Sequence, residues 1–230
     1  MIELWELRGD EDRRYSNFSW RTRMALRHKQ LEVVYRPVLL TDKAGIAFSG
    51  GTTVPVIRDG ETVVRDSWAI AEYLERQYPD KPSLFGGETG QALTRFFNTW
   101  VDRNVLAAAF PLLACDALAV QCEADRGYFS GLIEKLTRLT PAALKEQQPR
   151  NAERLAKVVD PARATLKRQA FLGGSVPAYC DYSLFSIYQW ARVASPLDLL
   201  ADDPLMKAWF ERLLDLNGGY ARHTPVHGAD

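Results

Sequence analysis

The strongest constraint on the fold is a change of pattern at residues 79–91, PDKPSLFGGETGQ, a segment rich in proline and glycine. This composition is typical of a linker. Before it, short strand-like runs alternate with helical ones, whereas after it every apolar stretch has helical spacing. A chain of 230 residues is long enough for two small domains. We therefore expect an α/β domain over residues 1–80 and an all-helical domain over residues 88–230.

The first 78 residues predict the element order β-α-β-α-β-β-α. Two strands joined through a helix pair in parallel with a right-handed crossover, and the Asp59-Gly60 turn makes the last two strands antiparallel. The result is a four-stranded mixed sheet with helices against it. Strands are expected at 2–7, 31–40, 54–57 and 62–64, helices at 18–29 and 67–78, and one or two weak turns at 42–51. Beyond the linker, helices are expected at about 91–116, 125–138, 151–171, 181–194 and 203–216.

Composition excludes several classes of protein. Lys plus Arg and Asp plus Glu are equal at 29 each, so no net charge attracts nucleic acid or an anionic membrane. No apolar run approaches the roughly 18 residues of a membrane span, and the N-terminus lacks the features of a signal peptide. Three cysteines without CxxC spacing predict neither a disulfide framework nor a zinc site, and indicate a cytoplasmic protein. The histidines are too scattered for a metal site, and each is expected at the surface: His28, His223 and His227.

One strand contains an unexpected residue. Pro55 lies in the strand that begins at Val54, where it cannot donate a ladder hydrogen bond. Further along, Asp66 and Ser67 stand at the start of a helix, where either side chain could serve as a cap. This combination, followed by a helical domain, resembles the glutathione transferase family. The segments that resemble its bacterial lignin β-etherases and related fungal-type, etherase-like members are residues 15–31, 65–85 and 171–185.

The resemblance implies a thioredoxin-like first domain that binds glutathione as co-substrate. It implies a cis Val54–Pro55 bond, with the Val54 backbone pairing with the cysteinyl part of glutathione as an added strand would. Asp66 would pair with the γ-glutamyl ammonium, while Ser67 and the helix N-terminus would bind its carboxylate. The alternative is that Asp66 or Ser67 only caps the helix. Thr53 replaces a longer polar side chain that often reaches the glycine carboxylate, and Lys43 could substitute for it.

By the same resemblance, Ser16 stands at the position that activates the thiol. A hydroxyl donor and a helix N-terminus stabilise the thiolate, which is the working nucleophile. Ser16 or Asn17 could instead be an ordinary N-cap, and Tyr15 is a rival donor. Asn17 stands where the subgroup usually has proline. Ala178 stands three residues before Asp181, where the family's capping box has Ser or Thr.

A pocket for the second substrate is expected between Tyr15 and the first helices of the second domain. Trp100, Phe110 and Tyr128 are candidates to line it, and aromatic lining suits a planar aryl substrate. Aromatic residues at helical spacing can equally be core. Residues 121–160 are charged and broken by prolines, which indicates an added helical excursion over the pocket.

Two functions follow from these residues. The first is a glutathione transferase whose thiolate attacks a small aromatic electrophile, with β-aryl ether cleavage as the form that the subgroup implies. The second is a non-enzymatic protein partner on the same fold, such as one that binds a bacterial cell-division filament. Asn17, Thr53 and Ala178 favour the second function. Ser16, the Val54-Pro55 pair and the Asp66-Ser67 pair favour the first. Family resemblance also implies a homodimer, with the sheet domain of one subunit against the helical domain of the other.

Overall fold

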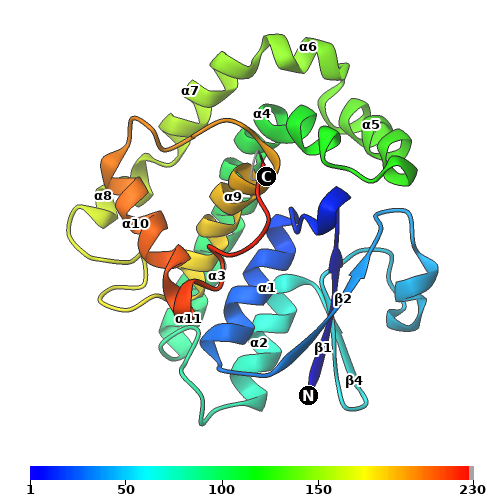
Figure 1. The fold of residues 1–230 in the computed structure, drawn as a ribbon. Helices are drawn as coiled ribbons and strands as arrows, with labels where there is room; N and C mark the ends of the chain where they lie inside the picture. The colour runs from blue at the N-terminus through cyan, green and yellow to red at the C-terminus, as the bar shows by residue number, and fades with distance from the viewer. Residues whose placement is uncertain (228–230) are drawn as a thin grey trace.

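The computed structural model describes residues 1–227 as a sheet domain packed against a larger helical domain (Figure 1). The sheet has the order β2-β1-β3-β4. β1 pairs in parallel with β2 and antiparallel with β3, and β3 pairs antiparallel with β4. The predicted mixed sheet and thioredoxin-like order are confirmed. The strands are β1 (Ile2–Leu7), β2 (Val33–Val38), β3 (Val56–Asp59) and β4 (Thr62–Arg65), and a 3₁₀ turn (Ala44–Ser49) takes the place of the second helix.

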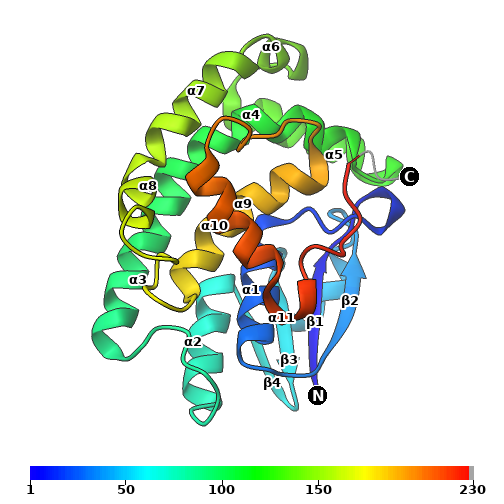
Figure 2. The same ribbon diagram turned by 60° about the vertical axis from the view of Figure 1, so that its left-hand side comes forward.

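Two helices of the first domain lie between the sheet and the second domain (Figure 2). α1 (Asn17–His28) and α2 (Ser67–Gln77) bury their apolar sides in a core that is continuous across both domains. The 3₁₀ turn packs on the opposite face of the sheet through a small apolar cluster of Trp5, Val38, Ile46 and Val56. Because the core runs across the domain boundary, the two domains pack against each other through apolar contacts.

The second domain is entirely helical, as predicted, and α9 runs through its centre with almost every residue buried. A π-helical turn (Val101–Val105) joins α3 and α4 into one rod. No helix between residues 1 and 227 is long and apolar enough to cross a membrane. The helices are α3 (Glu88–Trp100), α4 (Leu106–Ala119), α5 (Glu123–Thr137), α6 (Pro141–Glu146), α7 (Gln148–Val158), α8 (Asp160–Leu166), α9 (Tyr179–Ala194), α10 (Pro204–Leu214) and α11 (Leu216–Gly219).

His28 is not the surface residue that the sequence predicts. It is half-buried at the end of α1, where Nδ1 lies 2.6 Å from the Tyr182 hydroxyl and Nε2 lies 3.0 Å from the Ser83 carbonyl oxygen. Burial lowers the pKa of His28. The prediction is wrong because α1 packs directly on α9, so a helix end that reads as exposed becomes part of the domain contact.

The N-terminus of α9 keeps only half of the family's capping box. Ala178 occupies the N-cap and has no side-chain acceptor. Asp181 performs the other half, accepting the Ala178 N–H at 3.0 Å, and it also accepts the N–H groups of Leu172 (2.7 Å) and Gly173 (3.0 Å). A fourth donor, Trp209 Nε1, lies 2.9 Å away. The fully buried carboxylate therefore holds the preceding loop, the helix start and α10 together.

Restoring the missing half of the box should stabilise the protein. We expect Ala178→Ser to raise the free energy of unfolding by about 1 kcal/mol, because the new hydroxyl can accept the Asp181 N–H, which bonds at 3.0 Å to the Ala178 carbonyl oxygen of the same tight turn. Urea denaturation followed by circular dichroism measures the change. Ala178→Val, which enlarges the side chain without adding an acceptor, is the control, and equal or greater stability in that variant would contradict the capping explanation.

Candidate active site at the domain boundary

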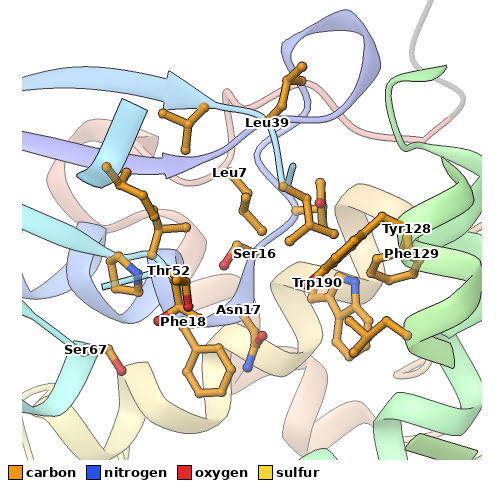
Figure 3. A pocket seen from close by; sticks show the side chains of 18 of the residues that line it. Leu7, Ser16, Asn17, Phe18, Leu39, Thr52, Ser67, Tyr128, Phe129 and Trp190 are labelled. Carbon is orange, nitrogen blue, oxygen red and sulfur yellow. The ribbon is translucent and has the colours of Figure 1, made fainter. Parts of the chain in front are cut away.

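A cavity of about 750 Å³ lies between the two domains (Figure 3). Its walls come from the loop before α1, the chain from β2 to β3, the start of α2, and helices α4, α5 and α9. One end is polar and the other is apolar. The polar end includes Ser16, Asn17, Lys43, Thr53, Asp66 and Ser67, and the apolar end includes Leu106, Phe110, Tyr128, Phe129, Leu132 and Trp190.

The Val54–Pro55 bond at the polar end is cis, as predicted. Val54 lies on the cavity wall, two residues before the start of β3. Within residues 1–227, neither the N–H nor the C=O of Val54 has a backbone partner. Free backbone groups beside a strand are the groups that an extended peptide needs in order to add to a sheet edge.

Asp66 and Ser67 form the N-terminus of α2, at the cavity. Asp66 is the N-cap, and its Oδ1 accepts the N–H groups of Trp68 and Ala69, both at 3.0 Å. Both bonds use Oδ1, so Oδ2 can accept from a bound cation. Asp66 has a φ of 74°, which is unfavourable for a residue with a side chain and is typical of functional positions. Ser67 is buried, and its side chain is directed to the cavity (Figure 3).

Ser16 and Asn17 lie together at the start of α1. The Ser16 Oγ accepts the Ser19 N–H at 3.3 Å, so Ser16 is the N-cap of the helix. As an acceptor in this bond, the hydroxyl retains its own proton for a group in the cavity. The Asn17 Nδ2 is buried and has no hydrogen-bond partner among residues 1–227. The capping role and a role toward a ligand are therefore compatible in Ser16, and Asn17 offers a second donor.

Tyr15 lines the cavity with its ring but does not offer its hydroxyl. The hydroxyl donates to Gln121 Oε1 at 2.7 Å, and burial raises the pKa of Tyr15. This geometry disfavours Tyr15 as a rival donor to a thiol, because its proton is already engaged in the core.

Lys43 reaches the cavity from the loop after β2. Its Nζ donates to the carbonyl oxygens of Leu40 (2.6 Å) and Thr52 (3.0 Å) and lies 5.5 Å from the centre of the Tyr128 ring. An ammonium group has three protons, so one remains for a ligand carboxylate. Thr53 lines the cavity beside Val54.

The aromatic wall differs from the one expected from sequence. Phe110 and Tyr128 line the cavity, but Trp100 does not: it packs against Phe97 on α3, with the ring centres 5.3 Å apart. The π-helical turn after Trp100 rotates α4 relative to α3. The side of α3 that carries Trp100 is therefore not continuous with the side of α4 that lines the cavity. In its place the structure brings in Trp190 of α9, whose Nε1 is buried without a partner among residues 1–227. No sequence signal distinguishes Trp190 from the other apolar residues of that buried helix.

Comparison with known proteins agrees with this geometry. Residues 12–82 match the glutathione S-transferase N-terminal domain, and residues 92–213 match the glutathione S-transferase C-terminal domain. The chain belongs to the glutathione S-transferase family. It is 22% identical over 207 residues to glutathione S-transferase U25 of Arabidopsis thaliana, covering 87% of this chain and 81% of that protein.

Solved structures of fungal family members have the same fold. The glutathione S-transferase CsGST63524 of Ceriporiopsis subvermispora, determined in complex with glutathione, superposes with a TM-score of 0.85 at 21% identity, covering 97% of this chain and 98% of that chain. The transferase GSTFuA3 of Phanerochaete chrysosporium has a TM-score of 0.76 at 24% identity, covering 96% and 93%.

Proposed function

We propose that this family member transfers glutathione to an aromatic electrophile. The supporting observation is that one cavity combines a polar end, with backbone and side-chain donors that have no partner among residues 1–227, and an apolar end with aromatic walls. None of the described residues lining it is a cysteine or a histidine. The nucleophile would therefore come from the bound thiol, and the protein would position and ionise it.

Glutathione would lie along the polar end. Its cysteinyl backbone would pair with Val54, its γ-glutamyl group would meet Asp66 and Ser67, and its glycine carboxylate would reach Lys43. A free thiol is mostly protonated at neutral pH, so the site must favour the thiolate. The Ser16 hydroxyl and the Asn17 amide supply two donors for that purpose.

The electrophile would occupy the apolar end, between Phe110, Tyr128 and Trp190. Among electrophiles, the more specific proposal is an aryl ether with a carbonyl on the carbon next to the ether carbon. The thiolate sulfur would form a bond to the carbon that bears the aryloxy group, and that group would leave as a phenolate with the bonding electron pair. The length of the aromatic wall, which is contributed by three separate helices, supports a substrate with more than one ring.

Direct binding separates the two functions. We expect calorimetry to detect glutathione binding and a conjugation assay with benzyl bromide to detect a thioether product by mass spectrometry. Asp66→Ala should weaken glutathione binding. A protein that does not bind glutathione at millimolar concentration would favour the non-enzymatic interaction protein, which the departures at Asn17, Thr53 and Ala178 also support.

We further propose a homodimer that uses the outward face of α3. Leu93 and Phe96 are 67% and 76% exposed, and with Phe97 and Trp100 they follow the 3-4 spacing of one helix face. An apolar stripe of this kind is typical of an interface with another protein.

A charge on that stripe should prevent association. We expect light scattering at micromolar concentration to give a dimer for the wild type and a monomer for Phe96→Glu, because an unpaired carboxylate would be buried in the interface. Val176→Glu is the control, since Val176 is 66% exposed but lies in the loop before α9, outside the apolar stripe of α3. A wild type that is monomeric, or a Phe96→Glu variant that stays dimeric, would contradict the proposed interface.

A further inference from the structure

One face of α5 carries both a buried carboxylate, that of Asp125, and the residues of this helix that line the cavity. Four residues of this helix line the cavity, and they follow Asp125 by three, four, seven and eleven positions. This spacing puts them on the same side of a helix as Asp125. The four residues are Tyr128, Phe129, Leu132 and Leu136.

Asp125 bonds across the domain boundary to the loop after β2. Its Oδ2 accepts the Leu40 N–H at 2.8 Å, and its Oδ1 accepts the Thr41 N–H at 2.9 Å and the Thr41 hydroxyl at 2.7 Å. The side chain is fully buried. Hydrogen bonds to a buried carboxylate are short and strong, so the position of α5 is set by the loop and not by apolar packing alone.

The same loop continues to the glutathione side of the cavity. Lys43 Nζ donates to the Leu40 carbonyl oxygen and to the Thr52 carbonyl oxygen. Thr52 stands two residues before Val54, whose free backbone groups face the cavity. Hydrogen bonds and short stretches of backbone thus connect the wall of the aryl end to the edge that would hold the tripeptide.

We propose that Asp125 is a positioning residue that couples the two ends of the cavity, so that glutathione and the aromatic substrate each raise the affinity for the other. The proposal rests on the proposed function of the cavity. Glutathione would order the segment from Leu40 to Val54, and Asp125 would transmit that order to α5 and its aromatic face. A second ligand then binds to a wall that is already ordered, so its binding loses less conformational entropy. The result is positive coupling without a change of fold.

Calorimetry can measure the coupling with a probe that a thiol does not attack. The probe is 4-phenylphenol, a neutral biaryl. For the wild type, we expect the glutathione Kd to fall at least about fivefold at saturating 4-phenylphenol, and the 4-phenylphenol Kd to fall by the same factor at saturating glutathione. In Asp125→Ala, we expect both ratios to lie within about twofold of one.

Two further variants separate coupling from damage to the fold. Asp116→Ala is the matched control, because Asp116 is also a buried carboxylate with three donors, Lys145, Gln148 and Ser195, all within the helical domain. It should leave the coupling ratio unchanged. Thr41→Val keeps the shape of the loop residue and removes one of the three bonds, so it should reduce the ratio without the loss of stability that Asp125→Ala risks.

Hydrogen exchange gives a second readout that needs no aromatic ligand. Glutathione alone should slow amide exchange in residues 123–137 of the wild type and of Asp116→Ala, but not of Asp125→Ala. Glutathione that binds without protecting this segment, or a wild-type coupling ratio of one, overturns the proposal while leaving the transferase function intact. An absence of glutathione binding overturns both, and titration of glutathione alone distinguishes the two results.

Discussion

Ser16→Ala should lower the turnover number for glutathione conjugation about tenfold to a hundredfold at neutral pH. The Ser16 hydroxyl already accepts the Ser19 N–H, so its proton is directed to another acceptor, and a thiolate sulfur in the cavity is the expected one. Losing one hydrogen bond to a charged group costs about 1.5–3 kcal/mol, which corresponds to that range of rates. Glutathione affinity should change little, because Val54, Asp66 and Ser67 would hold the rest of the tripeptide.

The pH dependence of the conjugation rate tests whether Ser16 lowers the pKa of the bound thiol. A donor that favours the thiolate holds the pKa of the bound thiol below its free value, so its removal raises that pKa. The rate deficit of Ser16→Ala should be greatest near neutral pH and should shrink as pH rises above the pKa of the variant's bound thiol. The thiolate absorbance of the glutathione complex measures this pKa directly.

Asn17→Ala is the companion variant, because its unpaired amide faces the same end of the cavity. If Ser16→Ala has no effect and Asn17→Ala reduces the rate, the donor to the thiol is Asn17. If neither variant changes the rate or the thiol pKa, the proposed mechanism is wrong. Tyr15→Phe should leave the thiol pKa unchanged, since the Tyr15 hydroxyl donates to Gln121.

Asp181→Ala should lower the free energy of unfolding by about 3–5 kcal/mol. The substitution leaves the buried Trp209 Nε1 and three partly buried backbone N–H groups without their acceptor, and a buried unsatisfied donor costs about 1–3 kcal/mol before any water enters the space. Loss of the carboxylate also removes the only remaining part of the capping box at α9. Urea denaturation measures the loss, provided that the transition is two-state.

An exposed carboxylate provides the control for Asp181. Asp198 also caps a backbone N–H, that of Leu200 at 3.0 Å, but its side chain is 57% exposed. We expect Asp198→Ala to cost no more than about 1 kcal/mol, since water can replace its bonds. Trp209→Phe, which removes one of the four donors with its ring retained, should reduce the cost of Asp181→Ala when the two are combined. Similar losses for Asp181→Ala and Asp198→Ala would contradict this account of the site.

Much of the sheet domain follows from local pattern. Turns and strand positions are set by the backbone preferences of a few neighbouring residues. Such local preferences indicate the Asp59-Gly60 turn, the alternation around it and the position of Pro55. Local pattern also places Val54 at a strand start and Asp66 and Ser67 at a helix start, but their roles at the polar end of the cavity were expected from the family resemblance.

The aromatic end could not be predicted in the same way. Whether a tryptophan of a buried helix lines a cavity or packs in the core depends on how the helices cross. The spacing of apolar residues along the sequence does not predict these crossings. The sequence therefore selected Trp100 and missed Trp190. Buried charges were missed for the same reason. Arg21 of α1 is fully buried and pairs with Asp102 at 2.7 Å, because α9 packs directly on α1.

The π-helical turn at Val101–Val105 lets the continuous helix formed by α3 and α4 present different faces before and after the turn. Each residue of an α-helix advances by about 100°, and a wider turn holds one residue more, so everything after it is rotated by roughly that angle. The half before the turn presents Phe96 outward, while the half after it presents Phe110 to the cavity. Substitutions that alter the proposed dimer interface could therefore accumulate in α3 while α4 keeps its orientation toward the cavity. New substrate preferences could likewise arise in α4 without disturbing that interface.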